Sequence, residues 1–431
     1  MPFPPAFPPA LRALNHRNFR RFYTGQAVSQ LGSWMQSVAI MWLAYRLSGS
    51  TAATGTIGFL AMIPFLAVTP LAGALSDRVS RRALLTRVQI SLFALAALLT
   101  LFTWMDRMTL VLLGMFAFAQ GVLSAMEVTT RHSFFAELID DKADLPNAIA
   151  LNSVNINATR LIGPALGGLA IAWAGEALCF GLNAISYLAV VAQLRRIAPR
   201  EAPRSETREP FLNGLAQGWK HAWNSPVVWP LVLIVGAVSF TINPYTVLMP
   251  AIAVQTFSRG AEMHGLFVTA VGAGALVGAV ILARRESVRG LSGYILFTAA
   301  CAAMGAAGFS FAAPMKSLEL SAVCMALLGF GLMGTSASVN TIIQTVTDDH
   351  LRGRVVSVYS TFFTGAVPLG HFAAGWVAEH IGAPRTVTVA GVLCAFATAA
   401  FAWKLPQLRR HLRVQYTARG IIAETPPNES R

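Results

Sequence analysis

Long apolar runs, separated by short charged segments, follow one another along almost the whole chain. Eleven runs contain no charged residue: 22–45, 47–76, 88–105, 108–126, 177–194, 221–258, 263–283, 290–315, 320–347, 355–378 and 386–403. A twelfth run, 145–175, is interrupted only by Arg160. A hydrocarbon core of about 30 Å requires about 20 residues of apolar helix. The pattern therefore predicts twelve membrane spans.

The spans are predicted to be helices and not the strands of a barrel. They are rich in Ala, Leu, Gly, Phe and Val, and they lack the period-two alternation of barrel strands. Backbone polar groups in lipid must be satisfied within the protein, and a helix does this by itself. We therefore expect an all-α polytopic membrane protein with twelve transmembrane helices in two six-helix halves.

The longest polar break divides the spans into two sets of six. It is charged and interrupted by prolines, which is typical of a linker. The expected parts are a tail at 1–21, a half at 22–198, a linker at 199–225, a second half at 226–404 and a tail at 405–431.

An amphipathic helix is predicted within the linker. The run 221–258 is too long for one span, and its first residues belong to the segment before it. Four apolar residues recur there at every fourth position: Phe211, Leu215, Trp219 and Trp223. This stripe predicts a helix over 209–224 that lies on the membrane surface.

A weak internal repeat relates the two halves. A shift of 204 positions places Ser153 on Ser357, Val154 on Val358 and Pro164 on Pro368. The loops that precede these segments both carry an Asp-Asp pair. The match falls at the fifth and eleventh spans, as a duplicated six-helix unit predicts. Related halves with a binding site between them suit alternating access.

Composition excludes an ordinary soluble enzyme. The chain is 55% hydrophobic and 12% charged, whereas soluble domains carry about 25% charged residues. Twenty-seven of the 33 Lys and Arg lie in segments on the side of the termini, and five lie on the other side. This asymmetry predicts cytoplasmic termini. The net charge of +14 is therefore a topology signal, and nucleic acid is not an expected partner.

The loop after the second span carries a motif with a known counterpart. It reads GALSDRVSRR and contains Gly73, Asp77, Arg78, Arg81 and Arg82. The chain here resembles the major facilitator superfamily, whose signature is Gly-x-x-x-Asp-Arg-x-Gly-Arg-Arg, although Ser80 replaces the second glycine. The resemblance, which covers nearly the whole chain, implies a cytoplasmic latch in which Asp77 faces the start of the eleventh helix. A loop that only follows the positive-inside rule would also place Arg81 and Arg82 here.

The fifth span contains Gly163, Pro164, Gly167 and Gly168. These residues resemble the Gly-Pro-x-x-Gly-Gly signature of superfamily exporters that run as proton antiporters, although Thr159 replaces its leading glycine. Proline removes a helix hydrogen bond and favours a kink, and the glycines permit close approach of another helix. Simple close packing is the alternative interpretation.

Further segments resemble the branch of enterobactin exporters and macrolide efflux proteins. They are the start NFRRFYTGQAVSQLGSWM, the LSGS that ends the first helix, the LPNAIALNS that opens the fifth and the RGRV after the tenth. The fourth span has Gln120 and Gly121, but Ala117 stands where many drug antiporters carry a proton-coupling arginine. The resemblance implies export of a small molecule across a bacterial inner membrane.

Charged residues inside the spans are the main candidate site. Glu127 lies about 13 Å from the cytoplasmic end of the fourth helix, and Arg160 lies about 20 Å into the fifth. Ionisable groups at such depths cost roughly 2.5–3.5 kcal/mol on insertion scales and indicate function. We expect Glu127 to be a protonation site and Arg160 to be its counter-charge or a contact for a substrate anion. A static Glu127–Arg131 pair that only orders the helix is the alternative.

The sequence thus predicts a monomeric, proton-coupled exporter of an amphipathic small molecule such as a siderophore or an antibiotic, and not an enzyme. No cofactor or metal is expected, because no ligand spacing or nucleotide loop occurs. An importer of a nutrient or lysophospholipid, and a non-transporting receptor or scaffold, remain alternatives. His371, Asn183 and Asn243 are weaker candidate residues, and Asn243-Pro244 predicts a broken seventh helix.

Overall fold

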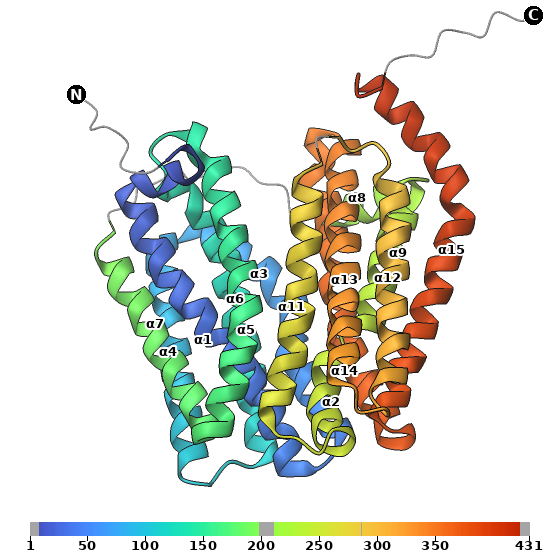
Figure 1. Ribbon diagram of the computed structural model, residues 1–431. Coiled ribbons are helices and arrows are strands. Elements are labelled where there is room, and N and C mark those ends of the chain that lie inside the picture. Colours follow the sequence, from blue (N-terminus) through green and yellow to red (C-terminus); the bar gives the residue numbers. More distant parts are fainter. Residues whose placement is uncertain (1–7, 198–210, 286, 423–431) are drawn as a thin grey trace, which may run out of the picture.

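The computed structural model describes residues 8–197, 211–285 and 287–422, and this part of the chain is built of helices without strands. The α-helices are α1 Arg17–Ser48, α2 Thr51–Met62, α3 Pro64–Arg78, α4 Arg81–Trp104, α5 Leu110–Leu138, α6 Leu145–Ala174, α7 Glu176–Arg195, α8 Phe211–Asn224, α9 Val228–Ile242, α10 Tyr245–Ala251, α11 Ala261–Ala283, α12 Leu291–Ala312, α13 Leu318–Val346, α14 Asp349–Ile381 and α15 Ala383–Ala418. Short helices η1 Pro9–Asn15, η2 Lys142–Asp144 and η3 Ile252–Thr256 complete the described elements. Figure 1 shows two bundles side by side, with α1 beginning and α15 ending at the same end of the molecule. We call this end the termini end.

The predicted all-α polytopic membrane fold is confirmed. Within the described residues, nine helical segments are long and apolar enough to cross a membrane. The remaining long helices are α1, α6 and α14, which have 32, 30 and 33 residues. Polar residues lower their hydropathy, and all three helices line the central cavity described below. They complete the twelve predicted spans.

Prolines break the second and seventh spans. Pro64 is the first residue of α3, and only Ile63 separates it from the end of α2 at Met62. The predicted break at Asn243-Pro244 is confirmed, since α9 ends at Ile242 and α10 begins at Tyr245. Proline lacks the N–H that would continue the hydrogen-bond ladder.

The first and last helices extend beyond the expected tails. Helix α1 begins at Arg17, five residues before the apolar run that predicted it. Helix α15 continues through Pro406 to Ala418, past the predicted boundary at 404. Hydropathy detects only the apolar part of a helix that lies in the lipid. The backbone hydrogen bonds of the helix continue into water until a residue interrupts them.

The internal repeat is present in three dimensions. Helices α6 and α14 begin at Leu145 and Asp349, which are 204 positions apart, and each contains the matched proline, Pro164 or Pro368. Helix α6 packs across the interface on α11, and α14 packs across it on α2. The two pairs are equivalent under the repeat.

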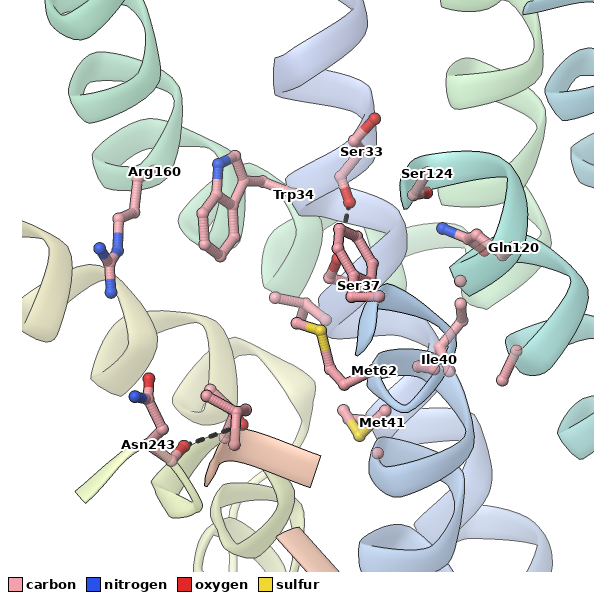
Figure 2. Close-up of a pocket in the computed structure, with 18 of the residues that line it drawn as sticks. Ser33, Trp34, Ser37, Ile40, Met41, Met62, Gln120, Ser124, Arg160 and Asn243 are labelled. Carbon is pink, nitrogen blue, oxygen red and sulfur yellow. Dashed lines mark hydrogen bonds between the residues drawn. The ribbon is translucent and has the colours of Figure 1, made fainter. Parts of the chain in front are cut away.

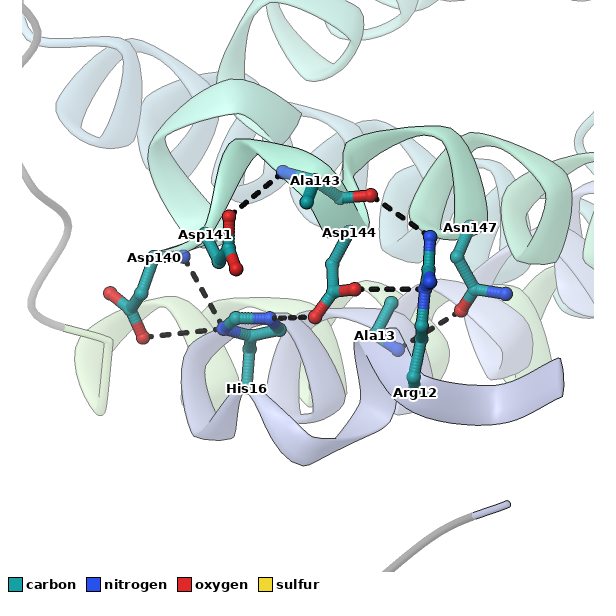
Figure 3. A network of polar contacts seen from close by, with 8 residues as sticks. All are labelled: Arg12, Ala13, His16, Asp140, Asp141, Ala143, Asp144 and Asn147. Carbon is teal, nitrogen blue, oxygen red and sulfur yellow. Dashed lines mark hydrogen bonds and ion pairs between the residues drawn. The ribbon is translucent and has the colours of Figure 1, made fainter. Parts of the chain in front are cut away.

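The acidic loops of the repeat each bind a terminal segment. In the first half, His16 lies 3.3 Å from Asp140 and 2.9 Å from Asp144, and Arg12 lies 2.8 Å from Asp144 (Figure 3). In the second half, Arg419 at the end of α15 lies 2.7 Å from Asp348. The terminal segments thus fasten the ends of α5 and α13 in equivalent ways.

The linker helix packs on the second half. Residues 198–210, and with them the first two residues of the predicted amphipathic helix, lie outside the described part. Helix α8 contacts the early part of α14, where Trp219 lies 5.6 Å from Phe362 between ring centroids. Trp223, one turn further along the same face, is exposed and lies 4.4 Å from Trp229 between ring centroids. Its predicted position on a membrane surface stays a prediction.

Candidate functional site

A cavity of about 480 Å³ lies between the two halves. Residues of α1, α2, α3, α5 and α6 line it from the first half, and residues of α10, α11 and α14 line it from the second. Cavities that bind small molecules measure about 300–1,000 Å³. The volume and its position at the interface of the repeats suit a small-molecule site.

The cavity wall combines apolar side chains with a few polar groups. Trp34, Met41, Met62 and Phe65 provide much of the apolar surface. Ser33, Ser37, Gln120 and Ser124 gather on α1 and α5, as Figure 2 shows. The Ser37 hydroxyl donates to the Ser33 carbonyl at 2.9 Å. Such a wall suits a bulky molecule with a few polar atoms.

One closure of the cavity joins α2 to α14 at the end away from the termini. A Cβ added to Gly55 would lie 2.6 Å from the His371 carbonyl oxygen and 2.8 Å from the Gly375 Cα. Glycine is therefore required for this backbone approach. The Glu379 carboxylate accepts hydrogen bonds from the backbone N–H groups of Thr51 and Ala52, at 2.8 and 3.1 Å.

The position of Glu379 beside the start of α2 favours the ionised form of its carboxyl group. It follows the apolar run 355–378 and so lies outside the membrane-spanning segment. Hydrogen bonds from the Ala52 N–H, then from Ser50 and Thr51, hold the pKa of the Glu379 carboxyl below its ordinary value. An anion at the N-terminus of α2 also complements the helix dipole. Glu379 thus fastens the second half to the first.

The equivalent closure joins α6 to α11. A Cβ added to Gly168 would lie 2.7 Å from the Ala261 carbonyl oxygen and 3.0 Å from the Gly265 Cα. Gly163 and Gly167 instead face α1, and α6 runs continuously through Pro164. The four signature residues therefore lie where α6 meets both its own half and the opposite one.

Glu127 belongs to a buried network on the side of the first half. Its carboxylate accepts from Gln26 at 2.8 Å and from Arg131 at 3.0 Å. Arg131 also donates to Asn152 at 3.3 Å. The network joins α1, α5 and α6, and both Glu127 and Arg131 contribute to the cavity wall.

Arg160 is not the counter-charge of Glu127. Its guanidinium lies over the Trp34 ring, 5.7 Å from the centroid, and it lines the cavity together with Tyr245 of the opposite half. The partner of Glu127 is Arg131, one helical turn away. The sequence offered this pair as the alternative, because Arg131 follows Glu127 by four residues on one helix.

The latch loop binds to its own half. Arg81 lies 2.8 Å from Glu137 at the end of α5. Arg82 donates to the carbonyls of Leu194 and Arg195 at the end of α7, at 2.8 and 3.0 Å. A cation is favourable at a helix C-terminus. These contacts fix the loop to the first half.

The remaining residues of the latch motif lie at the end of α3. Gly73 packs near Thr129 of α5, since a Cβ there would lie 3.9 Å from its methyl group. Arg78 is exposed and is the last residue of α3. Asp77 precedes it, and its side chain lies outside the described part. The implied contact of Asp77 with α14 stays a prediction.

Sequence reasoning missed several cavity residues of the second half. His264, Tyr245 and Thr246 line the cavity together with the weaker candidates His371 and Asn243. His371 lies well inside the apolar run 355–378, which is a signal for it, whereas His264 stands at the start of its run and gives no such signal. Asn183, in contrast, is fully buried and donates to Gln36 at 2.8 Å, away from the cavity wall.

Known proteins resemble this chain along most of its length. The Staphyloferrin A transporter of Staphylococcus aureus is 22% identical over 88% of the chain and 94% of its own. The multidrug efflux pump Tap of Mycobacterium tuberculosis is 26% identical over 88% of the chain and 91% of its own. Macrolide efflux protein A of Streptococcus pyogenes is 22% identical, over 86% and 93%.

Solved structures share the fold. A bacterial homologue of the lysosomal transporter Spinster, in an inward-facing conformation, superposes with a TM-score of 0.71 at 13% identity, covering 94% of this chain and 99% of its own. A D-xylose–proton symporter gives 0.66 at 13% identity, with 90% and 97% covered. At these identities the likeness concerns the fold alone.

Two six-helix repeats around one central cavity give this chain the fold of these transporters, and its relatives are transporters of the major facilitator type and not enzymes. The profile of the family described as "Transmembrane secretion effector" matches residues 9–418. The chain belongs to this family, and it is a multi-pass membrane protein.

Proposed function

We propose that the protein is a proton-coupled exporter of an amphipathic small molecule, a siderophore, an antibiotic or a related metabolite. The observation that carries this proposal is the cavity between the halves, closed at one end by the equivalent pairs α2–α14 and α6–α11. A site that opens alternately to either end of the molecule needs a closure of this kind that can form and break at each end.

Export is supported by the relatives. Two of those named above are efflux proteins, and the third is a siderophore transporter. The excess of Lys and Arg on the termini side supports a bacterial inner membrane with both termini in the cytoplasm. The closed end then faces outward, and the cavity opens toward the cytoplasm to receive its cargo.

Proton coupling rests on Glu127. A carboxyl in a buried network can change charge when a partner leaves or a ligand arrives. Release of the proton would restore the pair with Arg131 and the bond from Gln26, and protonation would weaken both. Two states of the network can thereby bias two states of the transporter.

Everted membrane vesicles test the proposal, with staphyloferrin A and a macrolide as probes. Respiration acidifies the lumen, and a quenched acridine dye reports the gradient. An exporter that exchanges protons for cargo moves protons out when a probe is added, so the dye regains fluorescence. A protein that moves cargo only from lumen to outside, or moves none, leaves the dye quenched, and either result refutes the proposal.

A further inference from the structure

Arg160 is a cation of the cavity wall that carries no ion pair in the described part of the chain. It stands halfway along α6, where lipid surrounds the bundle. An uncompensated charge at this depth is costly unless it meets a partner. The other arginine of the wall, Arg131, lies 3.0 Å from Glu127 and is neutralised by it.

The charges of the wall therefore do not balance. Glu127 and Arg131 cancel, and Arg160 leaves one positive charge facing the cavity. Low-dielectric walls strengthen the field of a buried charge and reduce its screening by salt. The unpaired positive charge of Arg160 favours a ligand with one negative group.

Neighbouring side chains hold the Arg160 head in place. The Trp34 ring lies against the guanidinium, and Tyr245 lines the same cavity from the opposite half. In Figure 2 the guanidinium points toward the side of the cavity that carries Asn243. Held in this way, its planar fork can donate two parallel hydrogen bonds to a carboxylate or sulfonate.

The same region offers another polar group without a partner. His264 of α11 lines the cavity and is 1% exposed, and its Nδ1 has no hydrogen-bond partner in the described structure. Its ring stacks on Trp42 at 6.4 Å. The cavity wall thus holds a second polar group that a bound ligand can satisfy, while the acid of the wall lies in the network on α5.

We infer that the transported molecule is an amphipathic organic anion whose acidic group binds Arg160 and whose apolar body contacts Trp34 and the methionines of the wall. This inference rests on the proposed function and names the substrate class of the same cavity. A cationic cargo would have to displace Arg131 from Glu127, whereas an anion finds Arg160 free of a carboxylate.

A matched pair of probes tests the inference. 1-Anilinonaphthalene-8-sulfonate is an aromatic anion, and N-phenyl-1-naphthylamine is the same body without the sulfonate. Binding of each is measured by fluorescence titration of the full chain in lipid nanodiscs, with empty nanodiscs subtracted. The variants are R160Q, R160K and, as control, R107Q, which removes an exposed arginine.

Wild type and R107Q are expected to bind the sulfonate at least tenfold more tightly than the neutral probe. R160Q is expected to lose tenfold or more for the sulfonate and to keep its affinity for the neutral probe, and R160K is expected to recover part of the loss. Equal binding of the two probes by wild type, unchanged sulfonate affinity in R160Q, or no binding of either probe overturns the inference.

The same probes separate this inference from the proposed function. Sulfonate preference without any probe-driven proton movement in everted vesicles would leave the anion site standing and remove proton-coupled export. Proton movement driven by both probes, without tighter binding of the sulfonate, would support proton-coupled export and remove the anion site.

Discussion

The carboxylate of Glu379 lies 2.8 Å from the backbone nitrogen of Thr51, which belongs to the opposite half of the molecule. The same oxygen accepts from the Ser50 and Thr51 hydroxyls, at 2.9 and 3.0 Å. A side chain of α14 thus caps the first turn of α2. Separation of the halves at this end must break all of these bonds.

Replacing Glu379 by Gln should favour opening at the end away from the termini. Loss of a helix cap costs about 0.5–2 kcal/mol, which changes the ratio of open to closed states by roughly two- to thirty-fold. The labelling rate of a cysteine placed at Thr51 should rise accordingly. E319Q, which alters an exposed acid at the start of α13, is the control and should label at the wild-type rate.

The same closure should depend on pH in a defined direction. The pKa of Glu379 is lowered in the closed state. Its contribution to the stability of the closed state is therefore complete when the pH is above the ordinary pKa of a carboxyl group. This stabilisation is lost as the pH falls below the ordinary pKa and through the lowered pKa of Glu379. Cysteine labelling at position 51 should therefore increase in acid for wild type and vary much less in E379Q. Identical pH profiles would show that Glu379 does not fasten the gate.

Exchanging the charges of Glu127 and Arg131 should distinguish a proton site from a static pair. E127Q is expected to abolish proton-driven transport while probe exchange without a gradient continues. The swapped variant E127R/R131E would restore a merely structural pair but would move the carboxyl out of its place. Recovery of proton-driven transport in the swapped variant would favour the static pair.

Substituting Leu for Gly168 should destabilise the closed end. The added Cβ would meet the Ala261 carbonyl oxygen at 2.7 Å, and overpacking of this kind costs about 1–3 kcal/mol. Cross-linking between α6 and α11 at their outer ends should fall. G353A, whose Cβ would have no neighbour within 4 Å, is the control. Unchanged cross-linking in G168L would contradict the role of this contact.

Hydropathy and spacing predicted the fold because membrane helices must be apolar over a fixed length. Twelve spans, the break at Asn243 and the repeat that relates Pro164 to Pro368 all follow from local sequence. The ends of α1 and α15 did not, since a helix continues beyond the lipid wherever nothing interrupts its ladder.

The site was predicted less completely. Depth along a helix marked Glu127 and Arg160 as buried charges, but partners are set by the packing of helices distant in sequence. Of the two partners considered for Glu127, the structure pairs it with Arg131, and nothing in the sequence singled out Trp34 or His264. The latch motif was recognisable from sequence, whereas its contacts with the ends of α5 and α7 depend on the packing of helices distant in sequence.

Paired distances at the two ends of α6 and α11 test the account most directly. In a variant without Cys179, Cys301, Cys324 and Cys394, spin labels at Ile149 and Ile281 would report the termini end, and labels at Trp173 and Arg259 the other. The two distances are measured by double electron–electron resonance in nanodiscs, at neutral and acidic pH, with and without the sulfonate probe. One distance should shorten whenever the other lengthens. Distances that never change, or that change in the same direction, would contradict alternating access by this protein.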